Sequence, residues 1–358
     1  MKTQLRHVLL GPAVIHKDRI TWLSPIVTAV IASVTVLICI ISDNDSAIFP
    51  MAIGVAFVGL ANFGDQAIER IKSMGWGILW LSLATLVGGS ISHLDLAQLP
   101  FVMFAALIAG FAGALGVRGS LIGVISLVIL LAFAGAPETE RTALTSAVLL
   151  ALGGLLQLVI GGAVLLVRYR GKERTTKDPR GSHSVIQRLR EHSTRKDLFT
   201  RHAVRLAIAI GVATAIAQSI GWPHEYWIPM IVVWMSRPDR NGTATRVFER
   251  TLGTLLGIGI SLLFLDLLQV GKDGLPIFVF VGTFVALAFF NANYPIAVAG
   301  ITLLLMSLFT IDGDPITETA PYRLMCTLIA AAITVAASFI WQYRPPMENS
   351  YAEQKSSA

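Results

Sequence analysis

A short stretch in the second half of the chain combines positive charge and glycine on one face of a predicted helix. At 100° per residue, four residues fall on one narrow stripe: Arg246, Arg250, Gly253 and Gly257. A guanidinium can bind a carboxylate through two parallel hydrogen bonds, and small residues four apart let two membrane helices approach closely. The stripe therefore predicts a helix that faces protein or a water-filled path and that could bind an anion.

The composition indicates a polytopic membrane protein. Hydrophobic residues make up 54% of the 358 residues and charged residues 14%, and the mean hydropathy is +0.68, which is outside the usual range of soluble domains. Apolar runs near the length needed to cross a bilayer are predicted at 22–42, 48–64, 73–92, 99–117, 119–135, 143–167, 203–220, 225–236, 247–268, 275–291, 294–311 and 321–343. We therefore expect an all-α polytopic membrane protein of about twelve transmembrane helices.

The basic residues predict the orientation of these helices. With both termini in the cytoplasm, all but three of the 28 lysines and arginines fall on the inner side, and the exceptions are Arg141, Lys272 and Arg323. This asymmetry is what the positive-inside rule describes. The net charge of +6 thus indicates topology and lipid contact and does not predict a nucleic-acid partner. We expect a multi-pass protein of a bacterial-type inner membrane.

The two halves of the chain resemble each other. Glu69-Arg70 and Glu249-Arg250 follow similar apolar residues at a spacing of 180. The same spacing aligns Ser73 with Gly253 and Gly77 with Gly257, and Arg141 aligns with Arg323 at 182. Because each half has an even number of predicted spans, the repeats would be parallel. The predicted segments are a cytoplasmic amino-terminal segment (1–20), a first six-helix repeat (21–168), a basic cytoplasmic linker (169–200), a second six-helix repeat (201–344) and a cytoplasmic tail (345–358).

Several polar residues are candidates for a solute path. The substrate-path candidates are Arg70, Arg246, Arg250, Asn291, Asn293, Tyr294, Arg141 and Arg323. Their alternative roles are lipid-phosphate anchors at the inner face, turn formation at 291–294, and snorkelling of Arg141 and Arg323 to the outer interface. Glu69 and Glu249 are candidates for carrying a coupling proton, the alternative being a static ion pair. Ser73, Gly77, Gly253 and Gly257 are expected to be helix-packing residues.

The second half resembles a known family of membrane transporters. The resemblance rests on four segments: His202-Ala-Val-Arg205, Gly221-Trp-Pro-His-Glu-Tyr-Trp227, Arg237-Pro-Asp-Arg-Asn-Gly-Thr243 and Arg246 to Gly257. These elements are similar to those of the fusaric acid resistance (FUSC) family, in the family's order and spacing, over roughly residues 200–343. The resemblance implies efflux of small organic anions, with aromatic carboxylic acids as the narrower expectation. Plant aluminium-activated malate channels look like distant relatives, which leaves a passive anion channel as an alternative.

Other classes of function find less support in the sequence. The Asp65–Lys72 segment faintly resembles a loop of the major facilitator transporters, so that class stays an alternative, as does a membrane scaffold that transports nothing. We find no phosphate-binding glycine loop, zinc-helix motif or nucleophile elbow in the sequence, so we expect neither an enzyme nor a catalytic residue. Cys39 and Cys326 both lie in apolar runs, and we expect neither a metal site nor a cofactor. The partners expected are membrane lipid and a small organic anion; a homo-oligomer is one open possibility, and whether a periplasmic adaptor binds is unknown.

Overall fold

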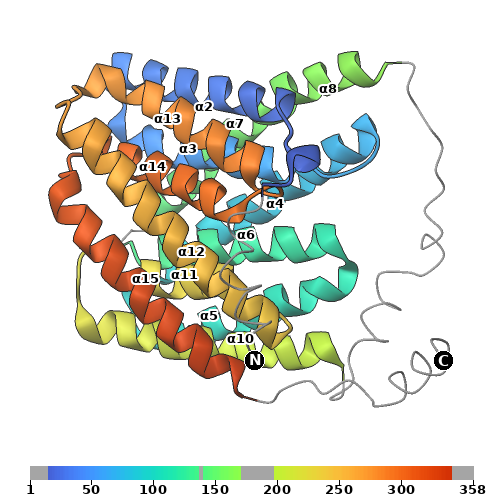
Figure 1. The fold of residues 1–358 in the computed structure, drawn as a ribbon, viewed down its shortest axis with the longest axis vertical. Helices are drawn as coiled ribbons and strands as arrows, with labels where there is room; N and C mark the ends of the chain where they lie inside the picture. Colours follow the sequence, from blue (N-terminus) through green and yellow to red (C-terminus); the bar gives the residue numbers. More distant parts are fainter. Residues whose placement is uncertain (1–14, 137–139, 171–196, 341–358) are drawn as a thin grey trace.

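A computed structural model describes residues 15–136, 140–170 and 197–340, and every regular element in these ranges is a helix. The longer elements of the first half are α2 (Leu23–Ile41), α3 (Asp45–Leu60), α4 (Ala67–Ile91), α5 (Leu99–Phe111), α6 (Val117–Ala134), α7 (Glu140–Leu156), the π-helical turn η5 (Gln157–Gly161) and α8 (Gly162–Tyr169). Those of the second half are α10 (Leu198–Ile220), α11 (Trp227–Met235), α12 (Arg240–Ser261), the π-helical turn η6 (Leu262–Asp266), α13 (Leu275–Phe289), α14 (Tyr294–Asp312) and α15 (Ile316–Ser338). Figure 1 shows them lying side by side across the molecule.

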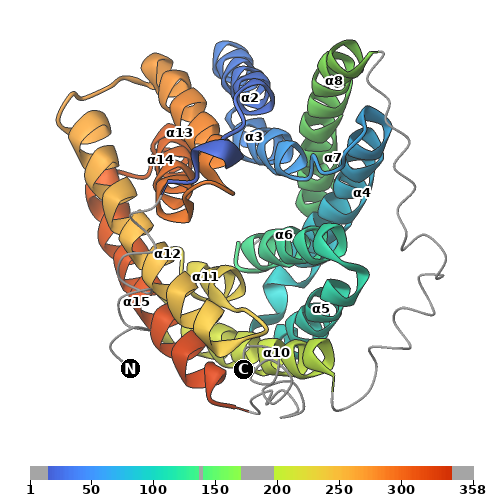
Figure 2. The ribbon, with the colours of Figure 1, turned by 45° about the vertical axis from the view of Figure 1, so that its right-hand side comes forward.

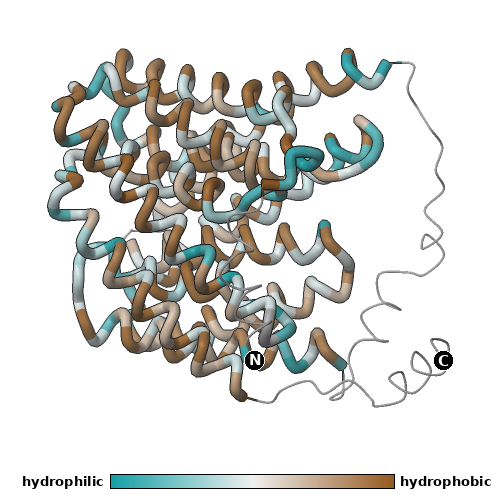
Figure 3. Tube along the Cα trace, in the orientation of Figure 1, coloured by the Kyte–Doolittle hydropathy of each residue, from teal (hydrophilic) through white to brown (hydrophobic). Residues whose placement is uncertain are grey.

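The described residues contain nine helical stretches that are long and apolar enough to cross a membrane. One of them, Ala67–Leu115, contains both α4 and α5, which are joined by the 3-10 segment Ser92–Gln98. Helix α3 is a shorter apolar helix. Figure 3 shows hydrophobic residues along most helices and hydrophilic ones mainly near their ends. Large apolar side chains also lie on the outside of the molecule, such as Ile38 of α2, which is 58% exposed. An apolar exterior of this kind suits a lipid surrounding.

Corresponding helices of the two halves pack in the same order. In the first half α2 packs on α3, α3 on α7, α7 on α4, α4 on α6, and α6 on α5. In the second half α10 packs on α11, α11 on α15, α15 on α12, α12 on α14, and α14 on α13. The halves meet where α2 packs on α13 and α10 packs on α5, and Figure 2 shows α2 beside α13 and α10 beside α5. These two pairs are reciprocal, since each joins the first helix of one half to the fourth of the other.

The small residues of the stripe allow α12 to approach α14. A Cβ atom added at Gly253 would lie 2.4 Å from the carbonyl oxygen of Pro295, and one added at Gly257 would lie 2.5 Å from Cβ of Thr302. Both distances are shorter than van der Waals contact, so only glycine fits at these two positions. At these two glycines the backbone of α12 therefore lies directly against α14, as in other closely packed membrane helices.

Candidate functional site

A cavity of about 70 Å³ lies between the two halves of the molecule. Its walls come from α3 and α6 of the first half and from α11, α13 and α14 of the second, and they are mostly apolar. The aromatic members of the lining are Phe49, Phe57, Trp234 and Phe290. Two guanidinium groups also reach it, those of Arg250 from α12 and Arg323 from α15. The cavity thus combines an apolar wall with two positive charges.

Arg250 is held in place by aromatic side chains. The residue is 2% exposed. Its Nη1 donates a hydrogen bond to the hydroxyl of Tyr294 at 3.3 Å, and its Cζ lies 5.9 Å from the centroid of the Trp234 ring. Its Nε has no hydrogen-bond partner among the described residues. Neutral and aromatic groups therefore surround a buried cation that keeps hydrogen-bonding capacity free.

Arg323 is buried more deeply still. It is 1% exposed, and its Cζ lies 4.8 Å from the centroid of the Trp227 ring. Its Nε also lacks a partner in the described part of the chain. Within the ranges described, neither this arginine nor Arg250 has a carboxylate at ion-pair distance. A buried charge is normally paired, so two unpaired cations in one cavity form a site suited to an anion.

The remaining arginine of the stripe lies at the polar start of α12. Arg246 stacks on the ring of Tyr294, with its Cζ 3.4 Å from the centroid, and its Nη1 lies 3.5 Å from Oε2 of Glu249. Nearby, in the loop before α12, burial and, to a smaller extent, the charge of Arg246 together lower the pKa of Arg237 to about 10. Arg237 stays protonated at neutral pH at this value, so this end of the second half carries several positive charges close together.

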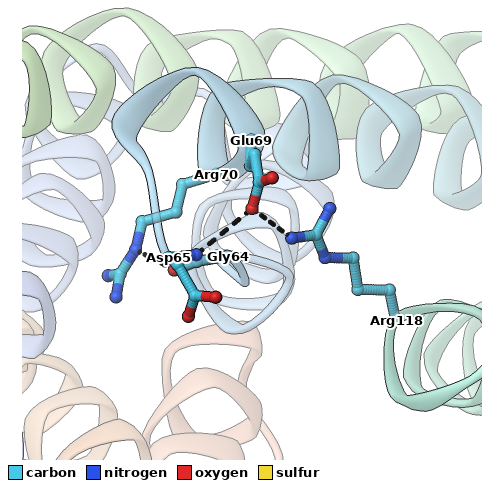
Figure 4. A network of polar contacts seen from close by, with 5 residues as sticks. All are labelled: Gly64, Asp65, Glu69, Arg70 and Arg118. Carbon is cyan, nitrogen blue, oxygen red and sulfur yellow. Dashed lines mark hydrogen bonds and ion pairs between the residues drawn. The ribbon is translucent and has the colours of Figure 1, made fainter. Parts of the chain in front are cut away.

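The matching residues of the first half form a different network. Figure 4 shows Glu69 of α4 pointing toward Arg118 of α6, while Arg70 turns back to the preceding loop. Oε2 of Glu69 accepts hydrogen bonds from Nη2 of Arg118 at 2.5 Å and from the backbone N–H of Asp65 at 3.2 Å. Nε of Arg70 donates to the carbonyl oxygen of Gly64 at 2.8 Å. None of these residues lines the central cavity, so the two halves are not chemically equivalent there.

Other predicted residues have local roles or lie away from the cavity. Oδ1 of Asn293 accepts from the backbone N–H of Ile296 at 3.1 Å and caps α14, while Asn291 is exposed. Arg141 is in the first turn of α7, and its side chain is outside the described residues. Ser73 is buried at 5% exposure, and a Cβ added at Gly77 would lie 3.0 Å from Cβ of Ala61. Both are placed as packing residues of α4.

Sequence reasoning found Tyr294 but missed the two tryptophans beside the arginines, Trp227 and Trp234. The sequence places five tryptophans near predicted membrane interfaces, as an aromatic belt would: Trp22, Trp76, Trp222, Trp227 and Trp341. Trp22 and Trp76 are 56% and 57% exposed, whereas Trp227 is 1% exposed and packs against Arg323, so the interpretation is wrong for Trp227. The spacing of Trp227 and Trp234, seven residues apart on one face of α11, is the signal that could have indicated a buried pair.

These elements define a polytopic α-helical membrane protein with a cationic cavity between its halves. Residues 212–337 match the family model described as fusaric acid resistance protein-like. The matched range includes α11, α12, α14 and the greater part of α15, and with them Arg250 and Arg323. Residues 212–337 are therefore similar to the fusaric acid resistance protein-like family, and the resemblance found in the sequence is confirmed.

The curated relatives agree in covering only part of the chain. The inner membrane protein YccS of Escherichia coli is 35% identical over 164 residues, which are 46% of this chain and 23% of that protein. An uncharacterized protein of Haemophilus influenzae is 30% identical over 170 residues, which are 46% of this chain and 23% of that protein. The uncharacterized protein slr1298 of Synechocystis is 32% identical over 140 residues, 39% of this chain and 18% of that protein. The matched stretch thus spans less than a quarter of each of these relatives. No solved structure matches the chain.

Proposed function

We propose that this protein is an inner-membrane transporter that moves small organic anions out of the cell, aromatic carboxylic acids among them. The observation that carries the proposal is the pair of buried guanidinium groups, Arg250 and Arg323, which line one apolar cavity without a carboxylate partner in the described ranges. The family of the second half supports transport, and the relative YccS, an inner membrane protein, supports the location.

The chemistry of the cavity suits an aromatic carboxylate. The carboxylate would accept hydrogen bonds from Arg250 and Arg323, and its ring would pack on aromatic walls such as Phe49 and Phe290. The cavity of about 70 Å³ is smaller than the roughly 150 Å³ that holds a benzene molecule. The helices must therefore move apart for such a solute to bind, which is what a transporter that changes conformation does and what an open pore does not need.

The packing order supports a two-repeat architecture. We propose twelve transmembrane helices, in parallel repeats over 21–168 and 201–344, with both termini and the linker in the cytoplasm. The support is the correspondence of helix contacts in the two halves and the reciprocal pairs α2–α13 and α5–α10. Rocking at these two pairs would widen or close the cavity between the halves.

The acidic residues at the inner end support a locking role. Glu249 is within reach of Arg246, and Glu69 is bonded to Arg118. The first pair lies within the amino-terminal half of α12, and the second joins the start of α4 to the start of α6. Breaking either pair would loosen the packing at that end of the helices. Proton transfer by either glutamate stays a narrower proposal, because each carboxylate already lies in an ion pair with an arginine.

A susceptibility profile tests the proposal. Cells lacking or overproducing the protein are compared on a panel of aromatic and aliphatic acids, with the Arg250→Gln variant and an exposed control, Lys72→Gln. We expect overproduction to protect against some aromatic acids, the control to behave as wild type and Arg250→Gln to lose protection at equal membrane abundance. An unchanged profile across the panel would refute anion export. Anion flux through proteoliposomes that persists without a proton gradient would instead favour the passive channel.

A further inference from the structure

A second cavity, of about 400 Å³, lies at the edge of the first half. It is lined by the segment that leads into α2, by α2 itself, by the first turn of α4 and by the continuous helix of η5 and α8. It shares no lining residue with the central cavity. Figure 2 shows α2 and α8 spread apart on the same side of the molecule, so the cavity is separate from the proposed anion site.

The mouth of this cavity is cationic. Arg70 and Arg168 both line it, together with Tyr169 and Trp22. Arg70 is fixed by its Nε bond to Gly64, and its Cζ lies 5.4 Å from the centroid of the Tyr169 ring. No carboxylate of the described ranges lies within ion-pair distance of either arginine. Two guanidinium groups are therefore free to bind a phosphate or carboxylate.

The cavity becomes apolar with depth. Val27 of α2 follows Trp22, the residue before that helix, by five positions, and Val164 precedes Arg168 by four in α8. At the α-helical rise, both lie about 6–7.5 Å deeper along their helices. Leu165 adds to the same apolar wall. At the far end Nε2 of Gln157 donates to Oγ1 of Thr28 at 2.9 Å, and Oε1 of Gln157 has no hydrogen-bond partner among the described residues. A cationic rim above apolar walls matches the headgroup and upper acyl chain of a lipid.

The surroundings of the cavity place it in the lipid-facing surface. Ile26 and Val30 of α2 are 40% and 46% exposed, and Leu166 and Val167 of α8 are 50% and 77% exposed. These apolar side chains flank the opening on both sides. Trp22, at 56% exposure, marks the interface level where tryptophans gather. A ligand that reaches the cavity along this surface is a membrane lipid and not a solute of the cytoplasm.

We propose that this cavity binds one anionic phospholipid of the inner leaflet. The headgroup phosphate accepts hydrogen bonds from Arg70 and Arg168, and an acyl chain runs along Val27, Val164 and Leu165. Basic pockets between membrane helices on the cytoplasmic side bind anionic headgroups in this way. The lipid would bridge α2 and α8, in addition to the contact that α2 makes with η5, the turn before α8. The site thus gives Arg70 a role outside the solute path.

Lipid binding by the purified full-length chain tests this proposal. The protein in neutral detergent is titrated with phosphatidylglycerol, with phosphatidylcholine of the same chains, and with inorganic phosphate, and bound lipid is counted by native mass spectrometry. We expect one tightly retained phosphatidylglycerol and no comparable retention of the other two. Replacing both arginines, Arg70→Gln with Arg168→Gln, should weaken retention about thirtyfold, at about fivefold for each lost surface charge.

Two matched variants keep the test decisive. Lys17→Gln with Lys72→Gln removes the same charge from exposed positions outside the cavity and should retain the lipid as wild type does. Arg70→Lys with Arg168→Lys keeps the charge and should retain most of the affinity, which separates loss of the site from misfolding. Equal retention of phosphatidylcholine, competition by inorganic phosphate alone, or unchanged retention in the double glutamine variant would each overturn the proposal.

Discussion

Replacing Arg323 by methionine should stabilise the protein, because Arg323 is a buried cation without an ionic partner. An arginine at the centre of a membrane helix costs about 2.5–3.5 kcal/mol, and a desolvated cation–π contact returns about 2 kcal/mol. The Cζ atom of Arg323 lies 4.8 Å from the centroid of the Trp227 ring, and its Nε has no hydrogen-bond partner among the described residues. The difference predicts that Arg323→Met raises the free energy of unfolding by about 1 kcal/mol.

Arg205 is the matched control, since it is also a buried arginine, at 7% exposure. Its Nη2 donates to the carbonyl oxygens of Arg237 at 2.5 Å and Pro238 at 3.0 Å. Arg205→Met removes both bonds and should lower the free energy of unfolding by about 2–3 kcal/mol. Reversible unfolding in mixed detergent micelles measures both variants. If Arg323→Met loses as much stability as Arg205→Met, Arg323 is a structural residue and the argument for an anion site fails.

Two further predictions concern packing and pH. Gly253→Leu should lower the free energy of unfolding by about 1–3 kcal/mol through overpacking against α14. Gly259→Leu is the control and should not lower it, because a Cβ added at Gly259 would meet nothing within 4 Å. Thermal denaturation compares the two variants, and equal losses of stability would contradict the α12–α14 contact. In the loop between α10 and α11, burial lowers the pKa of His224 from its usual value of 6.5, although its Nε2 lies 3.1 Å from Oδ2 of Asp314. Because the unfolded chain binds the proton first as pH falls, the stability that neutral His224 contributes above pH 6.5 is lost below it. Unfolding at pH 7 and pH 5 should show this loss, and an undiminished slope in His224→Gln would refute the assignment.

The all-helical, membrane-spanning character of the fold was predictable from the sequence. The apolar runs predict helices close to those described, because a membrane span must satisfy its own backbone hydrogen bonds and leaves hydropathy as a clear signal. The short run at 225–236 corresponds to α11, Trp227–Met235. The turns inside the long runs, such as the π-helical turn at Gln157–Gly161, have no such signal, since they depend on contacts with other helices.

The chemistry of the site was less predictable than the fold. The stripe of α12 identified Arg250 and the two glycines that face α14, because helical periodicity alone groups them. It could not distinguish Arg250, which lines the central cavity, from Arg70, its counterpart in the repeat, which lines a cavity at the edge of the molecule. That difference depends on which helices of the two halves meet. The burial of Trp227 against Arg323 is likewise a tertiary contact that local sequence does not encode.

Flux of an aromatic carboxylate through proteoliposomes tests the central claim most directly. Vesicles loaded with labelled benzoate would contain the wild type, Arg250→Gln, Arg323→Gln or the exposed control Lys72→Gln in equal amounts. We predict protein-dependent benzoate flux that is unchanged in the control and falls at least about tenfold in each arginine variant. A tenfold fall corresponds to the loss of one charge-assisted hydrogen bond. Benzoate flux equal to wild type in both arginine variants would contradict it.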